Sequence, residues 1–333
     1  MGLGLSIVAF VVGAAASLTT SWVLVSRLER VGERFGFSEA LLGLLAALAA
    51  DAPEITASVT ALAHHQRTVG AGVVIGSNVF NLAALLGLGA LVAGRIGLHR
   101  KVVVLGGTVA LLVGLVCLLG VAGVVTPTVA LVLVLAVLVP YVVVLWSPRR
   151  ALGRLRLPSA WTAWLTSAVV EEESELEVAF HPRRGTTNDT LVALGALAVV
   201  VGASVAMEQG ASTLGRHFGL AEIVVGGLVL AAVTSLPNAV AAVYLSRQGR
   251  GAAALSTALN SNAINVAIGL LIPAAVVGLA RPAAPGLLVA GWYVGLTALT
   301  LVLAYAGRGL RRPAGWVIVA AYGLFVAVLL AIT

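Results

Sequence analysis

The feature that most constrains this chain is an internal repeat. Residues 43–81 align without a gap on residues 227–265, at a constant offset of 184 positions, with nine identities in 39. Identities between Ala or Leu residues carry little weight here, but a proline followed at the same distance by Ser-Asn-x-x-Asn recurs in both copies. The chain is therefore expected to form two halves with equivalent backbones. The identical polar or proline positions are Pro53 and Pro237, Ser77 and Ser261, Asn78 and Asn262, and Asn81 and Asn265.

Both copies lie within long apolar runs. The chain is 60% hydrophobic and 10% charged, whereas a soluble domain carries about 25% charged residues. Runs of roughly 20 apolar residues are long enough to cross a bilayer, so the chain is predicted to be a polytopic membrane protein surrounded by lipid. Ten spans are predicted, at about residues 3–25, 37–63, 69–94, 102–121, 125–146, 190–209, 220–246, 252–279, 286–306 and 314–332.

The number of spans fixes how the two copies are related. Five spans separate each element from its copy, so the two halves must be inverted in the membrane. The predicted fold is an all-α polytopic membrane protein of ten transmembrane helices, arranged as two inverted five-helix repeats. The expected division is a first repeat at 1–146, a cytoplasmic linker at 147–188 and a second repeat at 189–333. Inverted repeats with interrupted helices and ions held near the midplane are typical of secondary transporters.

Basic residues predict the orientation. With the N-terminus outside, 17 of the 20 Lys and Arg residues fall on inner loops, and Arg67, Arg216 and Arg281 remain outside. Because inner loops of membrane proteins are enriched in Lys and Arg, both termini are predicted to lie outside. The net charge of +7 therefore reflects topology and does not indicate a nucleic-acid partner. The inner set is Arg27, Arg30, Arg34, Arg95, Arg100, Lys101, Arg149, Arg150, Arg154, Arg156, Arg183, Arg184, Arg247, Arg250, Arg308, Arg311 and Arg312.

The long hydrophilic stretch 147–188 has an acidic centre at 171–177, behind a piece containing Trp161 and Trp164. This pattern favours an interfacial helix followed by a solvated linker. A regulatory cation site on the glutamates is an alternative, although they lack the spacing of a calcium-binding loop.

Two acidic residues interrupt the second apolar span. Asp51 and Glu54 are three residues apart, nearly one helical turn, so both carboxylates share a face. Pro53 between them has no backbone N–H, which frees a carbonyl one turn earlier, near Ala49. An ionisable residue at the bilayer centre costs roughly 2.5–3.5 kcal/mol on insertion scales, so this pair is expected to bind a ligand. The alternative is that Asp51 only forms hydrogen bonds within the bundle.

At these residues the chain resembles the calcium/cation antiporter superfamily, which includes the sodium/calcium exchangers. The two stretches look like the alpha-repeats of that family, which read Gly-Thr-Ser-x-Pro-Glu and then Gly-Ser-Asn-x-x-Asn. Here the first repeat has 50-ADAPE-54 with 76-GSNVFN-81, and the second has 234-TSLPN-238 with 260-NSNAIN-265.

The resemblance implies a cluster of cation sites built from oxygen ligands, which suit hard cations such as Ca²⁺ and Na⁺. By position, Glu54 would be the principal cation ligand, with Asn81 and Asn265 as central oxygen donors. The remaining implied ligands or site positions are Asp51, Asn238, the hydroxyls of Ser77, Ser261, Thr234 and Ser235, and the carbonyls near Ala47 and Ala231. Sliding or rocking of the first and sixth spans past this core would give alternating access.

The chain departs from the family pattern in both repeats. Family members usually carry an acid in each repeat, whereas Asn238 stands in the second, and Ala50 and Asp51 replace a threonine and a serine in the first. Both carboxylates therefore come from one helix. Like charges this close disfavour each other's ionisation, so one is expected to hold a proton when no cation is bound. That opens a proton-coupled cycle beside a sodium-coupled one.

These features predict a secondary cation antiporter, most simply one that exchanges Ca²⁺ against Na⁺ or H⁺, in a bacterial inner membrane. The cations are substrates, and no resident cofactor is expected. No nucleophile triad, phosphate-binding loop or zinc-protease motif occurs, so an enzyme is not predicted. The alternative is a non-transporting cation sensor or structural membrane protein that retains the exchanger fold, with exchange disabled by Asn238.

Overall fold

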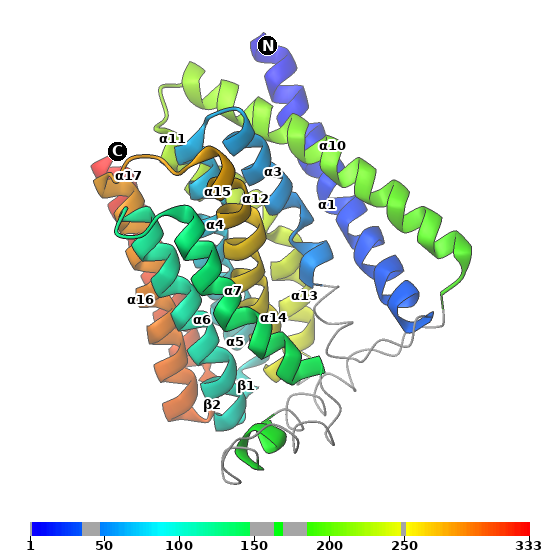
Figure 1. The fold of residues 1–333 in the computed structure, drawn as a ribbon, viewed down its shortest axis with the longest axis vertical. Coiled ribbons are helices and arrows are strands. Elements are labelled where there is room, and N and C mark those ends of the chain that lie inside the picture. The colour runs from blue at the N-terminus through cyan, green and yellow to red at the C-terminus, as the bar shows by residue number, and fades with distance from the viewer. Residues whose placement is uncertain (1, 35–46, 147–162, 169–184, 248–250) are drawn as a thin grey trace.

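We describe the fold from a computed structural model, which covers residues 2–34, 47–146, 163–168, 185–247 and 251–333. Most helices run roughly parallel or antiparallel to one another, α1 and α10 are inclined to them, and both termini lie at the same end of the molecule (Figure 1). We call this the terminal end. The shared end is the arrangement expected for an even number of spans.

In the described part of the chain, eight of the ten predicted spans correspond to helices that are long and apolar enough to cross a membrane. The other two are the second and seventh, which carry the repeat motifs and are broken within their length. Predicted and observed spans agree within a few residues at most ends. The first half comprises α1 (Leu3–Arg34), α3 (Ala52–Ala63), α4 (Arg67–Asn81), the π-helical η1 (Leu82–Leu88), α5 (Gly89–Ala93), the strand β1 (Arg95–Gly97), α6 (Arg100–Val121) and α7 (Pro127–Trp146).

The second half begins with α10, which runs in the opposite direction to its counterpart α1 (Figure 1). The two halves are therefore inverted, as predicted. This half comprises α10 (Thr187–His217), α11 (Glu222–Val224), the π-helical η2 (Val225–Leu230), α12 (Ala231–Thr234), α13 (Leu236–Arg247), α14 (Gly251–Ile264), the π-helical η3 (Asn265–Leu271), α15 (Ile272–Val277), α16 (Ala284–Gly307), the strand β2 (Gly309–Arg311) and α17 (Arg312–Ile332).

Helices α1 and α10 are longer than predicted. The sequence suggested that the first span ends near residue 25, before a charged link, and that the sixth covers 190–209. The predicted end of the first span and both predicted ends of the sixth are therefore wrong. The helices extend further because they pack against each other along their length and because Arg27 in the charged link forms an ion pair with Asp189. Asp189 caps the start of α10 through a reciprocal capping box with Thr186, and it forms a 2.6 Å ion pair with Arg27. Ser17 and Ser204 are hydrogen bonded at 2.8 Å nearer the middle of the pair.

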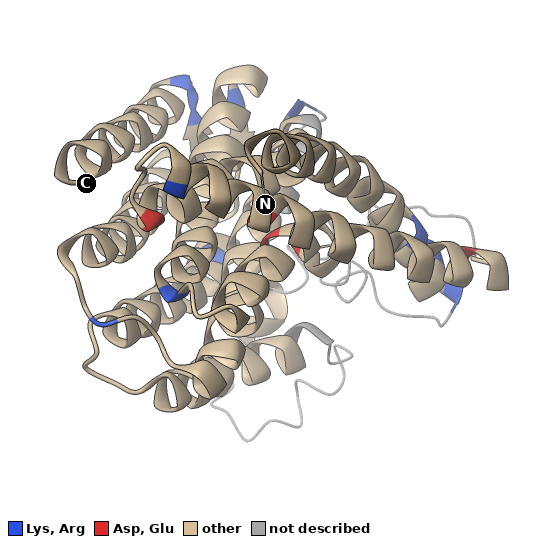
Figure 2. Cartoon of the chain, turned by 90° about the horizontal axis from the view of Figure 1, so that it is seen from above, with Lys and Arg blue, Asp and Glu red and all other residues tan. Residues whose placement is uncertain are grey.

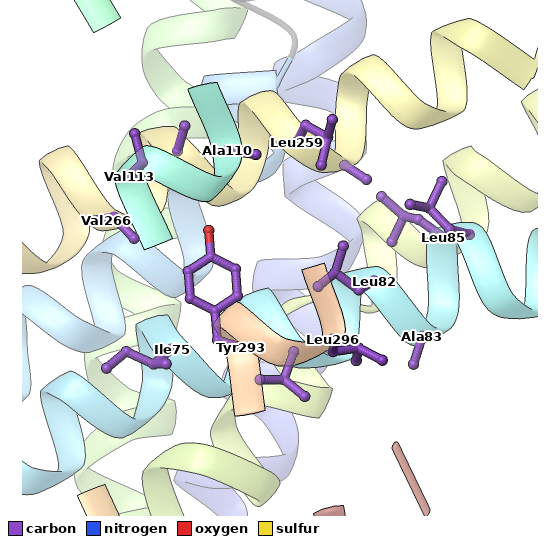
Figure 3. Packing of buried hydrophobic residues seen from close by; sticks show 14 of the residues in the cluster. Ile75, Leu82, Ala83, Leu85, Ala110, Val113, Leu259, Val266, Tyr293 and Leu296 are labelled. Carbon is purple, nitrogen blue, oxygen red and sulfur yellow. The ribbon is translucent and has the colours of Figure 1, made fainter. Parts of the chain in front are cut away.

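The remaining helices form a bundle beside this pair. Its interior is apolar and centred on the span Arg67–Ala93, formed by α4, η1 and α5. The apolar stretch of this span is 89% buried, against 17% for α1. Tyr293 of α16 projects from its helix among Val113, Val266 and other buried side chains (Figure 3). Large apolar side chains also cover the outer surface, and Val276 is 85% exposed. In a bilayer these surfaces contact lipid, so close packing between helices must hold the bundle together.

A two-stranded antiparallel ribbon lies at the end opposite the termini. Strand β1 pairs with β2 in the register Arg95 to Arg311 and Ile96 to Leu310. The sequence did not predict this ribbon, which joins the loop after α5 to the loop before α17. Two parts of the 147–188 stretch are described. One is a short helix at 163–168, in which Ser167 accepts a hydrogen bond from Lys101 at 2.8 Å, and the other is 185–188, where α10 begins. The acidic centre at 171–177 lies outside the described residues, so its predicted roles stay untested.

Candidate cation site

The two broken helices have equivalent backbones at the break. Helix α3 begins directly after Asp51, whose φ and ψ are −83° and −4°. Helix α12 ends directly before Ser235, whose φ and ψ are −85° and −1°. These two residues are related by the 184-residue offset, so the repeat predicted from sequence extends to backbone conformation. The prolines two residues later in each copy remove one helical hydrogen bond at each break.

The carbonyl that Pro53 frees in the first copy has a new partner. Ser21 of α1 donates its hydroxyl to the Ala49 oxygen at 3.4 Å. The predicted release of a carbonyl near Ala49 is therefore confirmed. It also provides one of the polar contacts between α1 and the bundle.

The four motifs meet inside the bundle. All of the residues predicted from sequence are brought together there, and every one is buried, with exposed fractions of 5% or less. They are Ala47, Asp51, Glu54, Ser77, Asn81, Ala231, Thr234, Ser235, Asn238, Ser261 and Asn265. Seen from above, most of the ribbon is uncharged, and red acidic segments lie within the bundle as well as near its edges (Figure 2).

Asn238 bridges the two carboxylates. Its side-chain nitrogen Nδ2 donates to Asp51 Oδ1 at 2.8 Å and lies 3.3 Å from Glu54 Oε1. Ser235 donates to the same Glu54 oxygen at 3.3 Å. The position that holds an acid in other members of the resembling family therefore faces the acid pair directly. In this geometry it presents a donor, which satisfies one oxygen of each carboxylate.

The hydroxyl groups of the two repeats have different partners. Ser77 lies 3.4 Å from the Ala231 carbonyl and 3.5 Å from the Thr234 hydroxyl. Its counterpart Ser261 has no equivalent threonine, because Ala50 occupies that position, and donates instead to Asp51 Oδ1 at 2.6 Å. The site thus has a hydroxyl pair on one side and a carboxylate–hydroxyl pair on the other.

The backbone comes close on the hydroxyl side because two glycines face each other. A Cβ atom at Gly76 would collide with the carbonyl oxygen of Gly227. Only glycine at this position allows α4 to approach η2 closely enough to place Ser77 against the backbone of α12.

The asparagines form a nearly two-fold symmetric group. Asn78 donates to the Asn262 carbonyl at 3.0 Å, and Asn262 donates to the Asn78 carbonyl at 3.1 Å. Asn81 then donates to the Asn262 amide oxygen at 3.1 Å, while Asn265 donates to the Asn78 amide oxygen at 3.3 Å. Asn78 and Asn262 were quoted as part of the repeat but were not predicted to belong to the site. Their identity in both copies was the signal that could have identified them.

Four buried oxygens of the site have no hydrogen-bond partner among the described residues. They are Asp51 Oδ2, Glu54 Oε2, Asn81 Oδ1 and Asn265 Oδ1. A buried acceptor without a donor is costly, by about 1–3 kcal/mol. Every donor nitrogen of the asparagine group is directed at another asparagine or serine, which leaves these carbonyl and carboxylate oxygens as acceptors only. They are the ligand types that hard cations prefer.

The predicted backbone ligands are partly engaged. The Ala47 carbonyl accepts the Asp51 N–H at 2.9 Å, and the Ala231 carbonyl accepts the Ser235 N–H at 3.2 Å. Each carbonyl oxygen has two lone pairs, so one remains for a further interaction at Ala47. Among the described residues no group of three His, Cys, Asp or Glu side chains is placed to hold a metal. The chemistry of the site is therefore that of amide, hydroxyl and carboxylate oxygens.

Comparison with known proteins places this geometry in a family. The family described as sodium/calcium exchanger protein matches residues 5–147 and residues 189–331, one match in each half of the chain. The chain belongs to this exchanger family. Its members are transporters, so the protein is a multi-pass membrane transporter and not an enzyme, as the sequence predicted.

Relatives in this family include the inner membrane protein YrbG of Escherichia coli, which is 28% identical over 242 residues. That match covers 72% of this chain and 70% of YrbG. The human sodium/potassium/calcium exchanger 1 is 29% identical over 126 residues, which cover 38% of this chain and 10% of the human protein.

Two solved exchanger structures share the fold. The H⁺/Ca²⁺ exchanger CAX superimposes with a TM-score of 0.71 at 15% identity, covering 98% of this chain and 82% of that one. The sodium-calcium exchanger NCX_Mj superimposes with a TM-score of 0.62 at 19% identity, covering 98% of this chain and 99% of that one. The predicted architecture of two inverted five-helix repeats is thereby confirmed.

Proposed function

We propose that this protein is a secondary antiporter that exchanges Ca²⁺ against Na⁺ or H⁺ by alternating access. The observation that carries the proposal is the group of four unpartnered oxygens contributed by both repeats, two from carboxylates and two from amides. Two carboxylates neutralise one Ca²⁺, and amide oxygens complete a hard-ligand set. Relatives whose names describe calcium exchange with sodium or protons support the choice of ions.

Cation binding requires one main change in the site, a reorientation of the Asn238 side chain. Its Nδ2 donates to both acids, so a divalent ion between them would meet a donor instead of a ligand. Rotation of the amide by half a turn presents Oδ1 in place of Nδ2 and converts a donor into a ligand. The residue that departs from the family pattern would then act as a neutral ligand, and the total ligand charge stays at −2.

The proposal is tested by uptake of radioactive Ca²⁺ into proteoliposomes under imposed Na⁺ and H⁺ gradients. We expect uptake driven by at least one gradient, and we expect it to be lost in Glu54→Gln and in Asp51→Asn. Ca²⁺ uptake that is unchanged by both substitutions would show that the cation site lies elsewhere. A folded, reconstituted protein with no gradient-driven flux would instead favour the sensor that Asn238 suggested.

The same proposal assigns the moving part. Helices α1 and α10 are joined to each other by the Arg27–Asp189 ion pair and the Ser17–Ser204 hydrogen bond. Among the described residues, their polar contacts with the bundle are those of Ser21 with Ala49 and of Ser212 with Gln66. We therefore expect the pair to move as one unit across the site. In a Cys117→Ala background, a short cross-link between Ser17→Cys and Ser204→Cys should preserve transport. A cross-link between Ser21→Cys and Ala49→Cys, which ties α1 to the bundle, should block it; transport in both cases would exclude this motion.

The proposal also includes the setting of the chain. We place it in a bacterial inner membrane with both termini outside and the 147–188 linker in the cytoplasm, since the basic residues of the inner loops then obey the positive-inside rule. Labelling of single cysteines at residue 2 and in the linker with a membrane-impermeant thiol reagent would test this orientation.

A further inference from the structure

A second carboxylate is buried at the terminal end, away from the acid pair. Glu208 of α10 is fully buried, and its Oε2 has no hydrogen-bond partner among the described residues. Its other oxygen, Oε1, lies 2.7 Å from the Ser212 hydroxyl. The same hydroxyl lies 2.7 Å from the amide oxygen Oε1 of Gln66, in the turn between α3 and α4. We call Glu208, Ser212 and Gln66 the terminal-end trio.

The trio has one polar hydrogen too few to make both of its 2.7 Å contacts hydrogen bonds. Ser212 has a single hydroxyl hydrogen, while the Gln66 amide oxygen and an ionised carboxylate only accept hydrogen bonds. Both 2.7 Å contacts cannot be hydrogen bonds from the same hydrogen. Three oxygens therefore converge around one hydrogen. A bound cation would balance the carboxylate, whereas a proton on Glu208 or a half-turn of the Gln66 amide would supply the missing hydrogen instead.

No basic side chain in the described part of the chain forms an ion pair with Glu208. Among the residues that the structure describes, the ion pairs all involve Asp189. The titratable or charged groups that act on Glu208 from nearby are His64 and Arg216, and neither lies within ion-pair distance of it. Arg216 is turned toward Thr213, to which it donates at 3.2 Å.

The trio lies between the surface of the terminal end and a buried apolar layer. Glu208 and Ser212 are buried, whereas Gln66 is half-buried and its neighbours His64 and His65 are exposed, so the trio lies just beneath the surface at the terminal end. Towards the acid pair, Ala57 and Ala61 of α3 pack with Met207 and Ala211 of α10 in a buried apolar layer. Helix α3 rises about 14 Å from Glu54 to its last residue, at 1.5 Å per residue, so the trio and the acid pair are separate sites.

We propose that the terminal-end trio is a second binding site, for a hard monovalent cation of the Na⁺ type. One carboxylate neutralises one monovalent charge, and the amide and hydroxyl oxygens are further ligands of the kind that Na⁺ accepts. Water entering past the half-buried Gln66 would complete the ligand shell. Because Gln66 belongs to the bundle and the other two residues to α10, the bound ion would join the moving helix pair to the bundle on the route to the central site. The inference rests on the proposed function only for this last role, since binding itself needs no transport.

The test measures Na⁺ binding to the full-length protein in detergent by calorimetry and by the Na⁺ dependence of Tm, with choline replacing Na⁺ at constant ionic strength. The central site is silenced by Asp51→Asn with Glu54→Gln. We expect this double variant to retain a Na⁺ response, and addition of Glu208→Gln to weaken the affinity by at least about tenfold, because the only charged ligand is lost. Ser212→Ala should weaken it less, and Glu222→Gln, an exposed acid near the same end, should leave it unchanged.

Two results would overturn the proposal. One is a Na⁺ response of the double variant that Glu208→Gln does not change. The other is a double variant without a Na⁺ response whose Tm depends on pH, with that dependence lost in Glu208→Gln. This second result would make the trio a proton site. If the double variant does not fold, the single variant Glu208→Gln is compared with the unmodified protein at saturating Ca²⁺, where the central acids are occupied; an unchanged Na⁺ response there also overturns it. Absence of Ca²⁺ flux in the unmodified protein would count against the proposed function, but it would not affect the Na⁺ binding measured at the terminal-end trio.

Discussion

The two half-sites of this protein, 50–54 and 234–238, have the same backbone and different chemistry. Asp51 and Ser235 adopt the same φ and ψ within a few degrees at the two helix breaks. One half supplies both carboxylates, whereas the other supplies Thr234, Ser235 and Asn238. The comparison teaches that the inverted repeat conserves the geometry of the break while the side chains it carries are free to change. The charge of the site is thus concentrated in one half, and the neutral donors of the other half are directed at it.

The largest difference between the halves is expected for the paired positions Asp51 and Ser235. Asp51→Ala should lower gradient-driven Ca²⁺ uptake by about 100-fold or more, since removal of one buried charged group costs several kcal/mol and 1.4 kcal/mol is a factor of ten. Ser235→Ala removes one hydrogen bond to Glu54 and should lower uptake only several-fold. Similar losses in both variants, in protein of equal Tm, would contradict the lopsided site.

The asparagines should show the opposite behaviour, because there the halves are equivalent. Asn78→Ala and Asn262→Ala each remove one of the two reciprocal bonds between side chain and backbone. Asn78→Ala also removes the acceptor of the buried Asn265 amide, and Asn262→Ala removes an acceptor of the buried Asn81 amide. We expect each to destabilise the protein by about 1–3 kcal/mol, with closely similar decreases in Tm measured in detergent. A large decrease in Tm in one variant alone would show that the two asparagines contribute unequally to stability, although their geometry is nearly symmetric.

Asn238→Asp should restore an acid to the second half. Its side chain already lies against both carboxylates, so the added charge would sit directly beside them. We expect Ca²⁺ affinity measured by calorimetry to rise by about tenfold, which corresponds to 1.4 kcal/mol. Asn238→Leu, which removes the amide, is the control and should weaken binding. Unchanged affinity in Asn238→Asp would count against a cation position beside Glu54.

The smallest effect is expected for the hydroxyl pair. Thr234→Val removes the hydroxyl that faces Ser77 while keeping the shape of the side chain. We expect a Na⁺ gradient to drive Ca²⁺ uptake a few-fold less well, with little change in uptake driven by a H⁺ gradient. Ala50→Thr, at the paired position, should have the reverse effect on Na⁺ dependence. Equal changes under both gradients would argue against a sodium role for these hydroxyls.

Much of the fold followed from local patterns in the sequence. We predicted ten spans in two inverted halves from the apolar runs of about 20 residues, their number and the 184-residue offset. This works because a segment that crosses a bilayer must span its thickness and satisfy its own backbone hydrogen bonds, which a helix does. The ends of α1 and α10 were missed, since their extension beyond the apolar runs depends on the contact of Arg27 with Asp189, 162 residues apart. The β1–β2 ribbon was missed for the same reason, as each strand has three residues and no local signal.

The sequence by itself determined which residues face the centre, because a proline and a Ser-Asn-x-x-Asn motif at fixed spacing place the same positions at each helix break. Only the tertiary structure decided how those residues are partnered. Ser261 donates to Asp51 because Ala50 offers no hydroxyl, and the side-chain nitrogen of Asn238 satisfies both acids at once. The same holds for Glu208, which is one acid among several in the sequence and becomes a buried carboxylate only when α10 meets the turn at Gln66. Hydrogen bonds between distant segments depend on three-dimensional proximity, which helical periodicity does not encode.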